Sequence, residues 1–401
     1  MEANPHKLKK LFSKVPEVTI FFWIIKVLCT TVGETFADFL NFNLGFGLSL
    51  TTMIMGIAFF IALFFQFRVI KYNPAIYWIT VVLISVFGTL VTDNLTDNIG
   101  IPLETSTLVF SVLLALTFLF WYLSEKTLSI HSIYTRKREA FYWLTILFTF
   151  ALGTAVGDLF SEQLGLGYLG TGLSVAIIIA CVYLAWKFVK LDGILAFWIV
   201  YILTRPLGAS LGDYLSQPKA NGALGLGTTG TSVIFLVAIL AIIIFLAVTK
   251  YDITVKNEAA ETNRTGIKKN VFVQTIVVLC IFLAVGIGGY ARLNSNIAAE
   301  TDAATQASLA GQLTDFVTIE RDMLKAVNAN DFVTAKKDAD VLETQWDTAE
   351  PKLRKIDGAT WTKVDGTIDV VLAAVRSGSP NAGKCESSLN KALSTLNEAN
   401  K

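Results

Sequence analysis

Long apolar stretches alternate with short polar connections over the first three quarters of the chain. Nine of the stretches reach the roughly 20 residues that an α-helix needs to cross a bilayer. They lie at 18–40, 48–67, 75–93, 103–123, 140–160, 168–188, 194–214, 229–249 and 271–291. The first contains Glu34 and Asp38 and lacks a small-residue cleavage site, so it is not read as a signal peptide. The pattern predicts an all-α, polytopic membrane protein with nine transmembrane helices.

Basic residues predict the orientation of these helices, because Lys and Arg concentrate in cytoplasmic connections. The connections on the side of the N-terminus carry seventeen of them: Lys7, Lys9, Lys10, Lys14, Arg68, Lys71, Lys126, Arg136, Lys137, Arg138, Lys187, Lys190, Lys250, Lys256, Arg264, Lys268 and Lys269. The opposite connections before the ninth span carry only Lys219. We therefore expect a cytoplasmic N-terminus (1–17), a cytoplasmic linker (251–270) and a tail (292–401) outside.

A repeated pattern divides the first eight spans into four units of two. An aromatic residue precedes Trp23, Trp78, Trp143 and Trp198, and an Asp stands fifteen residues after each Trp, at Asp38, Asp93, Asp158 and Asp213. Five residues before each Asp is a Gly, and the cores read GETFAD, GTLVTD, GTAVGD and GASLGD. Because each unit holds two spans, the four units are parallel and related by an axis along the membrane normal. Equivalent residues are then expected at equal depth.

The fourfold unit, marked best by GTAVGDLFSEQLGLG and GASLGDYLSQ, resembles a bacterial integral membrane protein family built from a repeat of unknown function. The resemblance covers roughly 18–250. The second unit departs most from the pattern, with Pro102 where the first and third have a second glycine. The resemblance implies a multi-pass protein of the bacterial plasma (inner) membrane and says little about activity.

The repeated Asp is the main candidate for chemistry. Fifteen residues of helix place it about 22 Å from its Trp, in the outer third of an apolar core about 30 Å thick. A carboxylate at that depth needs water, a partner or a cation, and helix C-termini with unwound carbonyls favour a cation. The predicted ion-binding residues are Asp38, Asp93, Asp158 and Asp213, which are also the predicted metal ligands, together with Glu34, Asp97, Glu162 and Arg205.

The ligand types indicate a hard cation. The layer holds no His or Cys, and oxygen ligands suit Mn²⁺, Mg²⁺, Ca²⁺, Na⁺ or protons. Arg205 lies eight residues before Asp213, and Glu34 lies one turn before Asp38. We expect Arg205 and Glu34 to pair, in competition with the cation, and Pro206 to loosen the helix beside them.

Other readings of these residues stay open. Each Asp could end its helix in water, and two sites of two Asp could replace one layer. The repeated Gly residues are expected to pack helices, the Trp quartet to form an interfacial belt, and Lys26 to snorkel or pair locally.

The tail has a different composition. Residues 292–401 carry apolar positions at helical spacing in four stripes, separated near 328–331, 351–358 and 378–380. This pattern predicts an extracytoplasmic, antiparallel four-helix bundle.

Composition restricts the function. Only 16% of residues are charged and the net charge is +1, which argues against a water-soluble enzyme and against nucleic acid as a partner. The sequence has no Walker loop and no Ser-His-Asp or Cys-His set, so we expect neither an enzyme nor a cofactor. The preferred function is a secondary transporter or channel for a small cation in contact with membrane lipid, with a homo-oligomer left open. The alternatives are a membrane-anchored receptor whose bundle binds a ligand or partner, and an assembly component.

Overall fold

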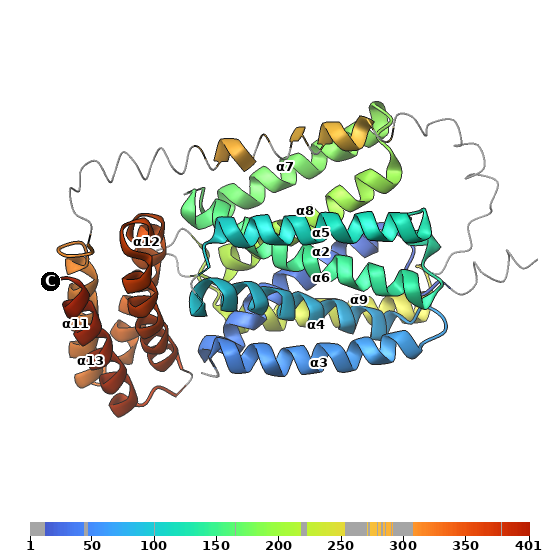
Figure 1. Ribbon diagram of the computed structural model, residues 1–401. Coiled ribbons are helices and arrows are strands. Elements are labelled where there is room, and N and C mark those ends of the chain that lie inside the picture. Colours follow the sequence, from blue (N-terminus) through green and yellow to red (C-terminus); the bar gives the residue numbers. More distant parts are fainter. Residues whose placement is uncertain are drawn as a thin grey trace, which may run out of the picture.

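The computed structural model describes residues 13–43, 47–99, 101–164, 166–217, 223–252, 308–377 and 379–401, with parts of 271–291. Eight of its helices are long and apolar enough to cross a membrane. They are α2 (Ile20–Asp38), α3 (Leu48–Arg68), α4 (Pro74–Asp93), α5 (Leu103–Glu125), α6 (Arg136–Asp158), α7 (Gly167–Phe188), α8 (Gly193–Ser216) and α9 (Thr228–Thr249). They lie side by side in Figure 1 and match the first eight predicted spans within a few residues. The protein is therefore all-helical in its described residues and has the helices of a multi-pass membrane protein.

The ninth predicted span, 271–291, is only partly described. Its described residues 273–278 are helical. Gln274 accepts a hydrogen bond from the backbone N–H of Asp192 at 3.0 Å, and Val278 packs against the apolar cluster between α7 and α8. The rest of this span, like most of the expected linker 251–270, lies outside the described residues.

The eight helices form two concentric sets. The inner set is α2, α4, α6 and α8; in each of these helices, 61–67% of the most apolar 18-residue stretch is buried. The outer set is α3, α5, α7 and α9, in which only 11–28% of the corresponding stretch is buried. Each inner helix contacts the next, and α8 contacts α2, so the four inner helices close a ring. The ring places the first helix of every repeat around one common axis.

The outer helices interlock the repeats. α3 packs on α4, α5 on α6, and α7 on α8, while α9 returns to α2. The second helix of each repeat therefore packs mainly against the first helix of the following repeat, and the fourth repeat completes the first. No repeat has a complete set of packing partners of its own.

Local sequence explains where the helices begin. Each inner helix starts at a residue whose side chain accepts a backbone N–H, namely Thr19, Asn73, Thr135 and Asp192. Such N-caps satisfy helix donors that would otherwise lack a partner. Before α3 and α9, Gly47 and Gly227 adopt φ of 73° and 76°, a left-handed conformation that glycine reaches without a steric penalty. The glycines after the repeated Asp thus serve the turn into the outer helix.

The repeated glycines of the inner helices pack the ring. A methyl group at Gly33 would overlap Ser85, one at Gly88 would overlap Phe150, one at Gly153 would overlap Arg205, and one at Gly208 would overlap Thr30. In every case the neighbour is the residue three positions before the glycine of the adjoining repeat. The packing role expected from small residues is confirmed at all four positions.

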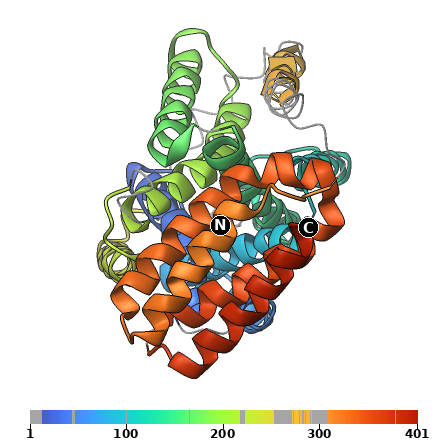
Figure 2. The ribbon, with the colours of Figure 1, turned by 90° about the vertical axis from the view of Figure 1, so that its left-hand side faces the viewer.

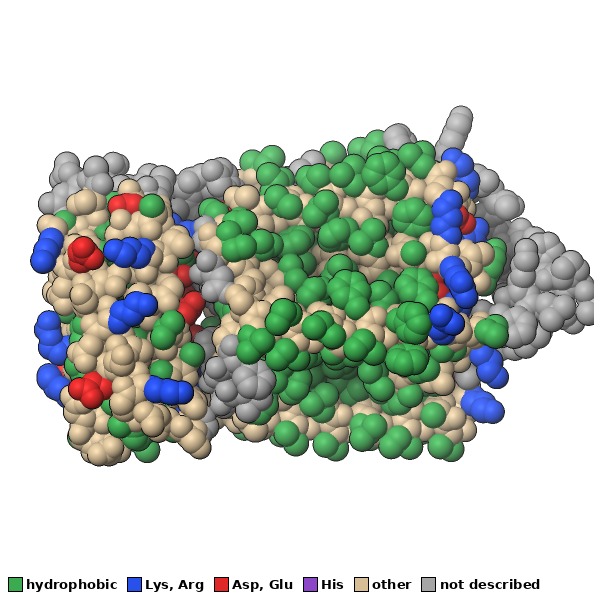
Figure 3. Space-filling model, turned by 60° about the horizontal axis from the view of Figure 1, so that its bottom comes forward, with side chains coloured by type: hydrophobic (Ala, Val, Ile, Leu, Met, Phe, Trp, Pro, Cys, Tyr) green, Lys and Arg blue, Asp and Glu red, His purple; other side chains and the backbone are tan. Residues whose placement is uncertain are grey.

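The surface of the eight helices is apolar. Large exposed side chains include Met53, Phe60, Leu108, Ile177 and Leu240. Figure 3 shows the apolar side chains spread over this face, with Lys and Arg gathered at one end. We call this the basic end. The opposite end, near which the four repeated Asp residues lie, is the aspartate end. An apolar band bounded by charge is what a bilayer requires.

Polar contacts hold the basic end together. Lys14, which is 6% exposed, forms an ion pair of 2.5 Å with Glu139 of α6, and the amide of Gln66 donates to the same carboxylate at 3.1 Å. Nearby, the Tyr72 hydroxyl donates to Asp252 at 2.6 Å. These bonds join the segment before α2 to α3 and α6, and the segment after α3 to the segment after α9.

The end of the chain forms a helical unit at the aspartate end. It contains α11 (Thr314–Asn328), α12 (Phe332–Arg376) and α13 (Ala382–Ala399), and α12 is interrupted by non-helical backbone at Asp357. These helices share a buried cluster that includes Phe316, Trp346, Trp361 and Leu389. Seen from this side, they lie across the end of the membrane helices (Figure 2).

Candidate functional site

Four levels of residues line the inside of the ring. Counting from each repeated Trp, positions 3, 7, 11 and 15 lie near one face of the inner helix because steps of four keep to one side. The first level is Lys26, Val81, Ile146 and Tyr201; the second is Thr30, Ser85, Phe150 and Arg205; the third is Glu34, Thr89, Thr154 and Ala209; the fourth is the Asp quartet. The residues of the first three levels are at most 7% exposed. Depth along the axis therefore corresponds to position in the repeat.

Arg205 closes the axis at the third level. Its Nη2 donates to Glu34 Oε2 at 2.6 Å, to Thr154 Oγ1 at 2.7 Å and to Thr89 Oγ1. Glu34, Thr89 and Thr154 are the equivalent residues of the first three repeats. One guanidinium from the fourth repeat thus binds the same position in each of the other three.

The predicted pair between Arg205 and Glu34 is present. The Arg205 side chain is fully buried and that of Glu34 is 10% exposed. Arg205 Nη1 also donates to the Thr30 carbonyl at 3.4 Å. Removing one partner of such a buried pair leaves an uncompensated charge, which costs about 3–5 kcal/mol. The pair therefore both neutralises Glu34 and joins α8 to α2, where the ring closes.

Four carboxylates lie at the next level. Asp38, Asp93 and Asp158 are the last residues of α2, α4 and α6, and each is followed by a π-helical turn: η1 (Phe39–Asn43), η2 (Asn94–Asn98) and η4 (Leu159–Gln163). Such turns interrupt helices, often at functional sites. Asp213 is 8% exposed and lies inside α8, which continues to Ser216 without a π-turn.

The Asp quartet shares one electrostatic environment. Each of the four carboxylates interacts with Glu34, and interactions between Asp residues cross from one half of the repeat to the other, as between Asp38 and Asp158. This arrangement favours one layer over two separate sites. Among the described residues, however, no three His, Cys, Asp or Glu side chains are arranged to hold a metal ion together. In the described residues, the layer therefore groups four carboxyl groups without forming a preformed chelate.

Two other predicted site residues lie on the π-turns. Asp97 belongs to η2 and Glu162 to η4, but their side chains are outside the described residues. Their predicted role therefore stays a prediction.

Helix α12 faces the Asp quartet from outside the ring. It contacts η1, η2 and η4. Glu343 and Arg376 interact electrostatically with Asp38, and Glu350 interacts with Asp158. The charges near the aspartate end thus come from two parts of the chain.

The same helix contributes further acids. Asp347 interacts with Glu343, Glu350, Asp365 and Asp369, and burial followed by repulsion from Glu343 raises the pKa of Asp347 well above its usual range. Burial, again followed by Glu343, raises the pKa of Asp369 to about 7. Arg376 binds Glu343 at 2.6 Å and Asp340 at 2.8 Å. The helical unit therefore places both acids and an arginine above the aspartate layer.

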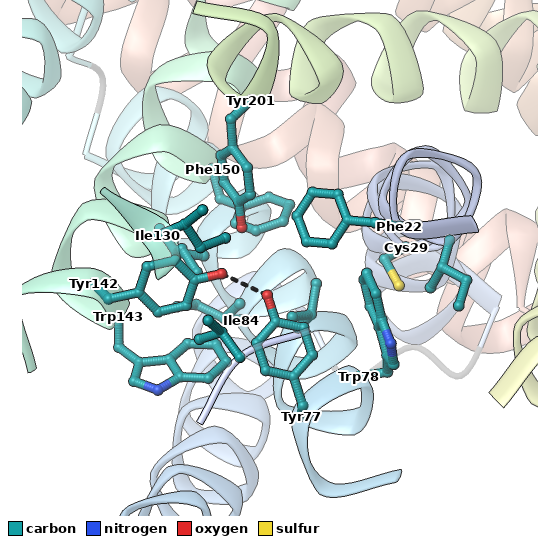
Figure 4. Packing of buried hydrophobic residues seen from close by; sticks show 14 of the residues in the cluster. Phe22, Cys29, Tyr77, Trp78, Ile84, Ile130, Tyr142, Trp143, Phe150 and Tyr201 are labelled. Atoms are coloured by element: carbon teal, nitrogen blue, oxygen red, sulfur yellow. Dashed lines mark hydrogen bonds between the residues drawn. The ribbon is translucent and has the colours of Figure 1, made fainter. Parts of the chain in front are cut away.

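Towards the basic end, the ring is filled by aromatic residues. Figure 4 shows Phe22, Tyr77, Trp78, Tyr142 and Tyr201 packed together. The Tyr77 and Tyr142 hydroxyls lie 2.5 Å apart and share a hydrogen bond. The interior is thus polar from the third level to the aspartate end and mainly apolar on the other side.

The positions of the repeated Trp residues contradict the expectation that they form a belt at the membrane interface. Trp78, Trp143 and Trp198 are at most 4% exposed, and Trp198 donates from Nε1 to the Leu128 carbonyl at 2.9 Å. These side chains face other helices, not the membrane surface, so the belt reading is wrong for them. Their amphipathic rings are used at helix contacts near the basic end.

Sequence reasoning also missed partners of Arg205. Thr89 and Thr154 accept hydrogen bonds from the Arg205 guanidinium, beside Glu34. Lys26 is buried, so its amine does not reach the membrane surface as expected. The threonines occupy the position that Glu34 holds in the first repeat. Aligning the repeats residue by residue would have placed all three together.

The repeat itself matches a known family. The model of the Repeat of Unknown Function (DUF347) matches four times, at 21–72, 76–127, 141–192 and 196–251, which together exceed half of the chain. The chain belongs to this family. The four matches coincide with the four helix pairs α2–α3, α4–α5, α6–α7 and α8–α9. No curated protein and no solved structure matches the chain.

Proposed function

We propose that this DUF347 protein transports a small hard cation across the membrane. The observation that carries the proposal is the mutual interaction of four equivalent carboxylates with Glu34 inside one ring, next to a single buried guanidinium. Five acids grouped around one arginine attract positive charge, and in a low-dielectric surrounding that attraction is strong. Carboxylates at membrane depth are typical of ion pathways.

Arg205 supplies the gate in this proposal. Its guanidinium occupies the axis and neutralises Glu34, so an entering cation competes with it for the same carboxylate. Pro206 lies inside α8 and lacks the N–H of a regular helical turn. The backbone beside Arg205 is therefore less restrained than that of the other inner helices, and movement of Arg205 away from Glu34 opens the third level.

The remaining assignments follow from charge and ligand type. The basic end is cytoplasmic under the rule that Lys and Arg remain inside, so the aspartate end and the helical unit are extracytoplasmic in the bacterial plasma membrane. The ninth span continues the chain outward to this unit, which folds as a four-helix bundle. Oxygen ligands favour Mn²⁺, Mg²⁺, Ca²⁺, Na⁺ or protons as cargo, and no catalytic step or cofactor is required.

Flux through the purified protein tests this proposal. Proteoliposomes containing the full chain are loaded with an ion-sensitive dye and exposed to Mn²⁺, Mg²⁺, Ca²⁺ or Na⁺. We expect uptake of at least one cation, and at least a tenfold loss of uptake on Asp38→Asn, Asp93→Asn, Asp158→Asn or Asp213→Asn. Glu386→Gln removes an exposed acid on α13 and serves as the matched control. Full uptake by all four Asn variants would disprove the assignment.

A receptor function is the second candidate, because α12 interacts electrostatically with Asp38 and Asp158. Ligand binding to the helical unit would then change the charge above the ring. Ending the chain after residue 291 separates the two functions. A transporter keeps measurable cation flux without the helical unit, whereas a receptor without the unit no longer binds its ligand.

A further inference from the structure

Lys26 is a buried amine without a polar partner. Its side chain is 1% exposed, and Nζ has no hydrogen-bond acceptor among the described residues. Instead, Nζ lies 3.9 Å from the centre of the Phe150 ring and 4.3 Å from that of Tyr201. Aromatic faces attract an ammonium group, but they replace neither an anion nor water.

The amine reaches across the axis of the ring. Lys26 belongs to α2, and Phe150 belongs to α6, the helix diagonally opposite in the ring. The equivalent residues of the other repeats are Val81, Ile146 and Tyr201. A lysine is therefore unnecessary for packing at this level, and its presence departs from the pattern at a cost in desolvation.

Among the described residues near Nζ, the Arg205 guanidinium is the one permanently charged group. Arg205 lies on the same ring of Phe150, with its Cζ 6.0 Å from the ring centre, and repels Lys26. The other titratable groups near it are the Cys29 thiol on α2 and the Tyr201 hydroxyl on α8, with the Tyr142 and Tyr77 hydroxyls behind them on α6 and α4. No described carboxylate faces the amine.

We propose that Lys26 is the proton-carrying residue that couples cation movement to protons, so that the protein works as a cation/proton antiporter. This inference rests on the proposed function and names its coupling ion. Lys26 Nζ binds one proton from water on one side of the membrane and later releases it to water on the other, and no other bond changes. The amine stands between the aromatic cluster of the basic end and the gate formed by Arg205.

The geometry explains why the two movements would be coupled. A cation that binds Glu34 displaces the Arg205 guanidinium, and Phe150 and Lys26 lie on the side away from Glu34. The displaced charge repels an ammonium at Lys26 more strongly, so the proton leaves. Conversely, a proton on Lys26 favours Arg205 at Glu34 and excludes the cation. Each ligand lowers the affinity for the other, as linkage requires.

The test measures cation and proton movement together. Proteoliposomes with the full chain and the pH dye pyranine inside receive Mn²⁺, Mg²⁺, Ca²⁺ or Na⁺ outside, with the membrane potential clamped by K⁺ and valinomycin. For the wild type, we expect the lumen to become more alkaline as the cation enters. In Lys26→Met and Lys26→Gln, cation entry down its gradient continues, but the pH change per cation falls at least tenfold.

The controls separate the possible failures. Ile146→Met alters the same level of the ring without removing an amine and is expected to keep both signals. An unchanged pH signal in the two Lys26 variants would overturn the proposal, as would failure of both to fold, since Lys26 would then be structural. Absence of any cation signal in the wild type would instead show that the proposed function, and this inference with it, is wrong.

Discussion

Arg205 and Glu34 join the last repeat of the membrane domain to the first. Their ion pair measures 2.6 Å and lies between α8 and α2, the contact at which the ring of inner helices closes. The pair has no counterpart in the other repeats, where the position of Glu34 is Thr89, Thr154 or Ala209. One charged contact thus breaks the fourfold pattern at the level nearest the Asp quartet.

Removing one charge of this pair is expected to destabilise the fold. Glu34→Gln leaves the buried guanidinium without an anion and should lower the free energy of unfolding by about 3 kcal/mol, measured by thermal unfolding in detergent. The double exchange Glu34→Arg with Arg205→Glu should recover part of this loss. Glu104→Gln, outside the ring, is the control, and a wild-type midpoint for Glu34→Gln would contradict the role of the pair.

The repeated glycines allow a matched comparison. Gly208→Ala places a methyl group against Thr30 and Thr31 and should lower stability by about 1–3 kcal/mol, as overpacking does. Gly230→Ala, in the outer helix α9, meets nothing within 4 Å and should be neutral or stabilising, because alanine favours helix. Thermal midpoints in detergent compare the two. Equal midpoints would mean that close packing at Gly208 is not needed.

The helical unit contains an acid whose titration should affect stability. Glu320 is fully buried, neither of its carboxylate oxygens has a hydrogen-bond partner among the described residues, and burial raises its pKa to about 8. The folded state therefore holds this proton more tightly than the unfolded state. Its contribution is complete below the unfolded pKa, near 4.5, and is lost as pH rises to about 8.

Glu320→Gln should remove this dependence. Between pH 5 and 8, the wild-type protein is expected to lose a few kcal/mol that the variant retains, so the difference in unfolding free energy grows with pH. Circular dichroism of thermal unfolding at several pH values measures it. Glu386→Gln, at an exposed position, should follow the wild type, and parallel pH curves for Glu320→Gln and the wild type would refute the expectation.

The basic end offers a test of a single hydrogen bond. Tyr72→Phe removes the donor to Asp252 Oδ2; Asp252 is 3% exposed, and its Oδ1 has no partner among the described residues. Leaving a buried carboxylate unsatisfied should cost about 1–3 kcal/mol. Tyr122→Phe changes a tyrosine that is 52% exposed and should have little effect. Chemical unfolding in mixed micelles would compare the two, and equal stabilities would argue against the bond.

The membrane helices could be predicted from the sequence because they are defined by length and apolarity. All eight observed spans start within a few residues of the predicted ones, and fixed spacing from Trp to Asp placed equivalent residues at equal depth. The Arg205–Glu34 pair was also predictable, since few charges lie at that depth and opposite charges there must meet.

Other contacts depend on how the repeats are arranged around the axis. The sequence alone does not indicate that α3 packs on α4 rather than on α2. This packing between repeats buries Trp78 and Trp143 away from lipid. Nor does it state that the ring brings Lys26 of α2 against Phe150 of α6. Spacing within one helix predicts a face, whereas contacts across a ring require the order of the helices around it.

The return of α9 to α2 has a consequence for biosynthesis. Helix α2 receives its outer neighbour only when α9, the last helix of the fourth repeat, has entered the bilayer, some two hundred residues later. Until then, Thr35 of α2 lacks the Ser232 hydroxyl of α9, which donates a hydrogen bond to it in the folded protein. Insertion intermediates should therefore depend on lipid or on a membrane chaperone, and loss of any one repeat from the gene should leave the product open on one side.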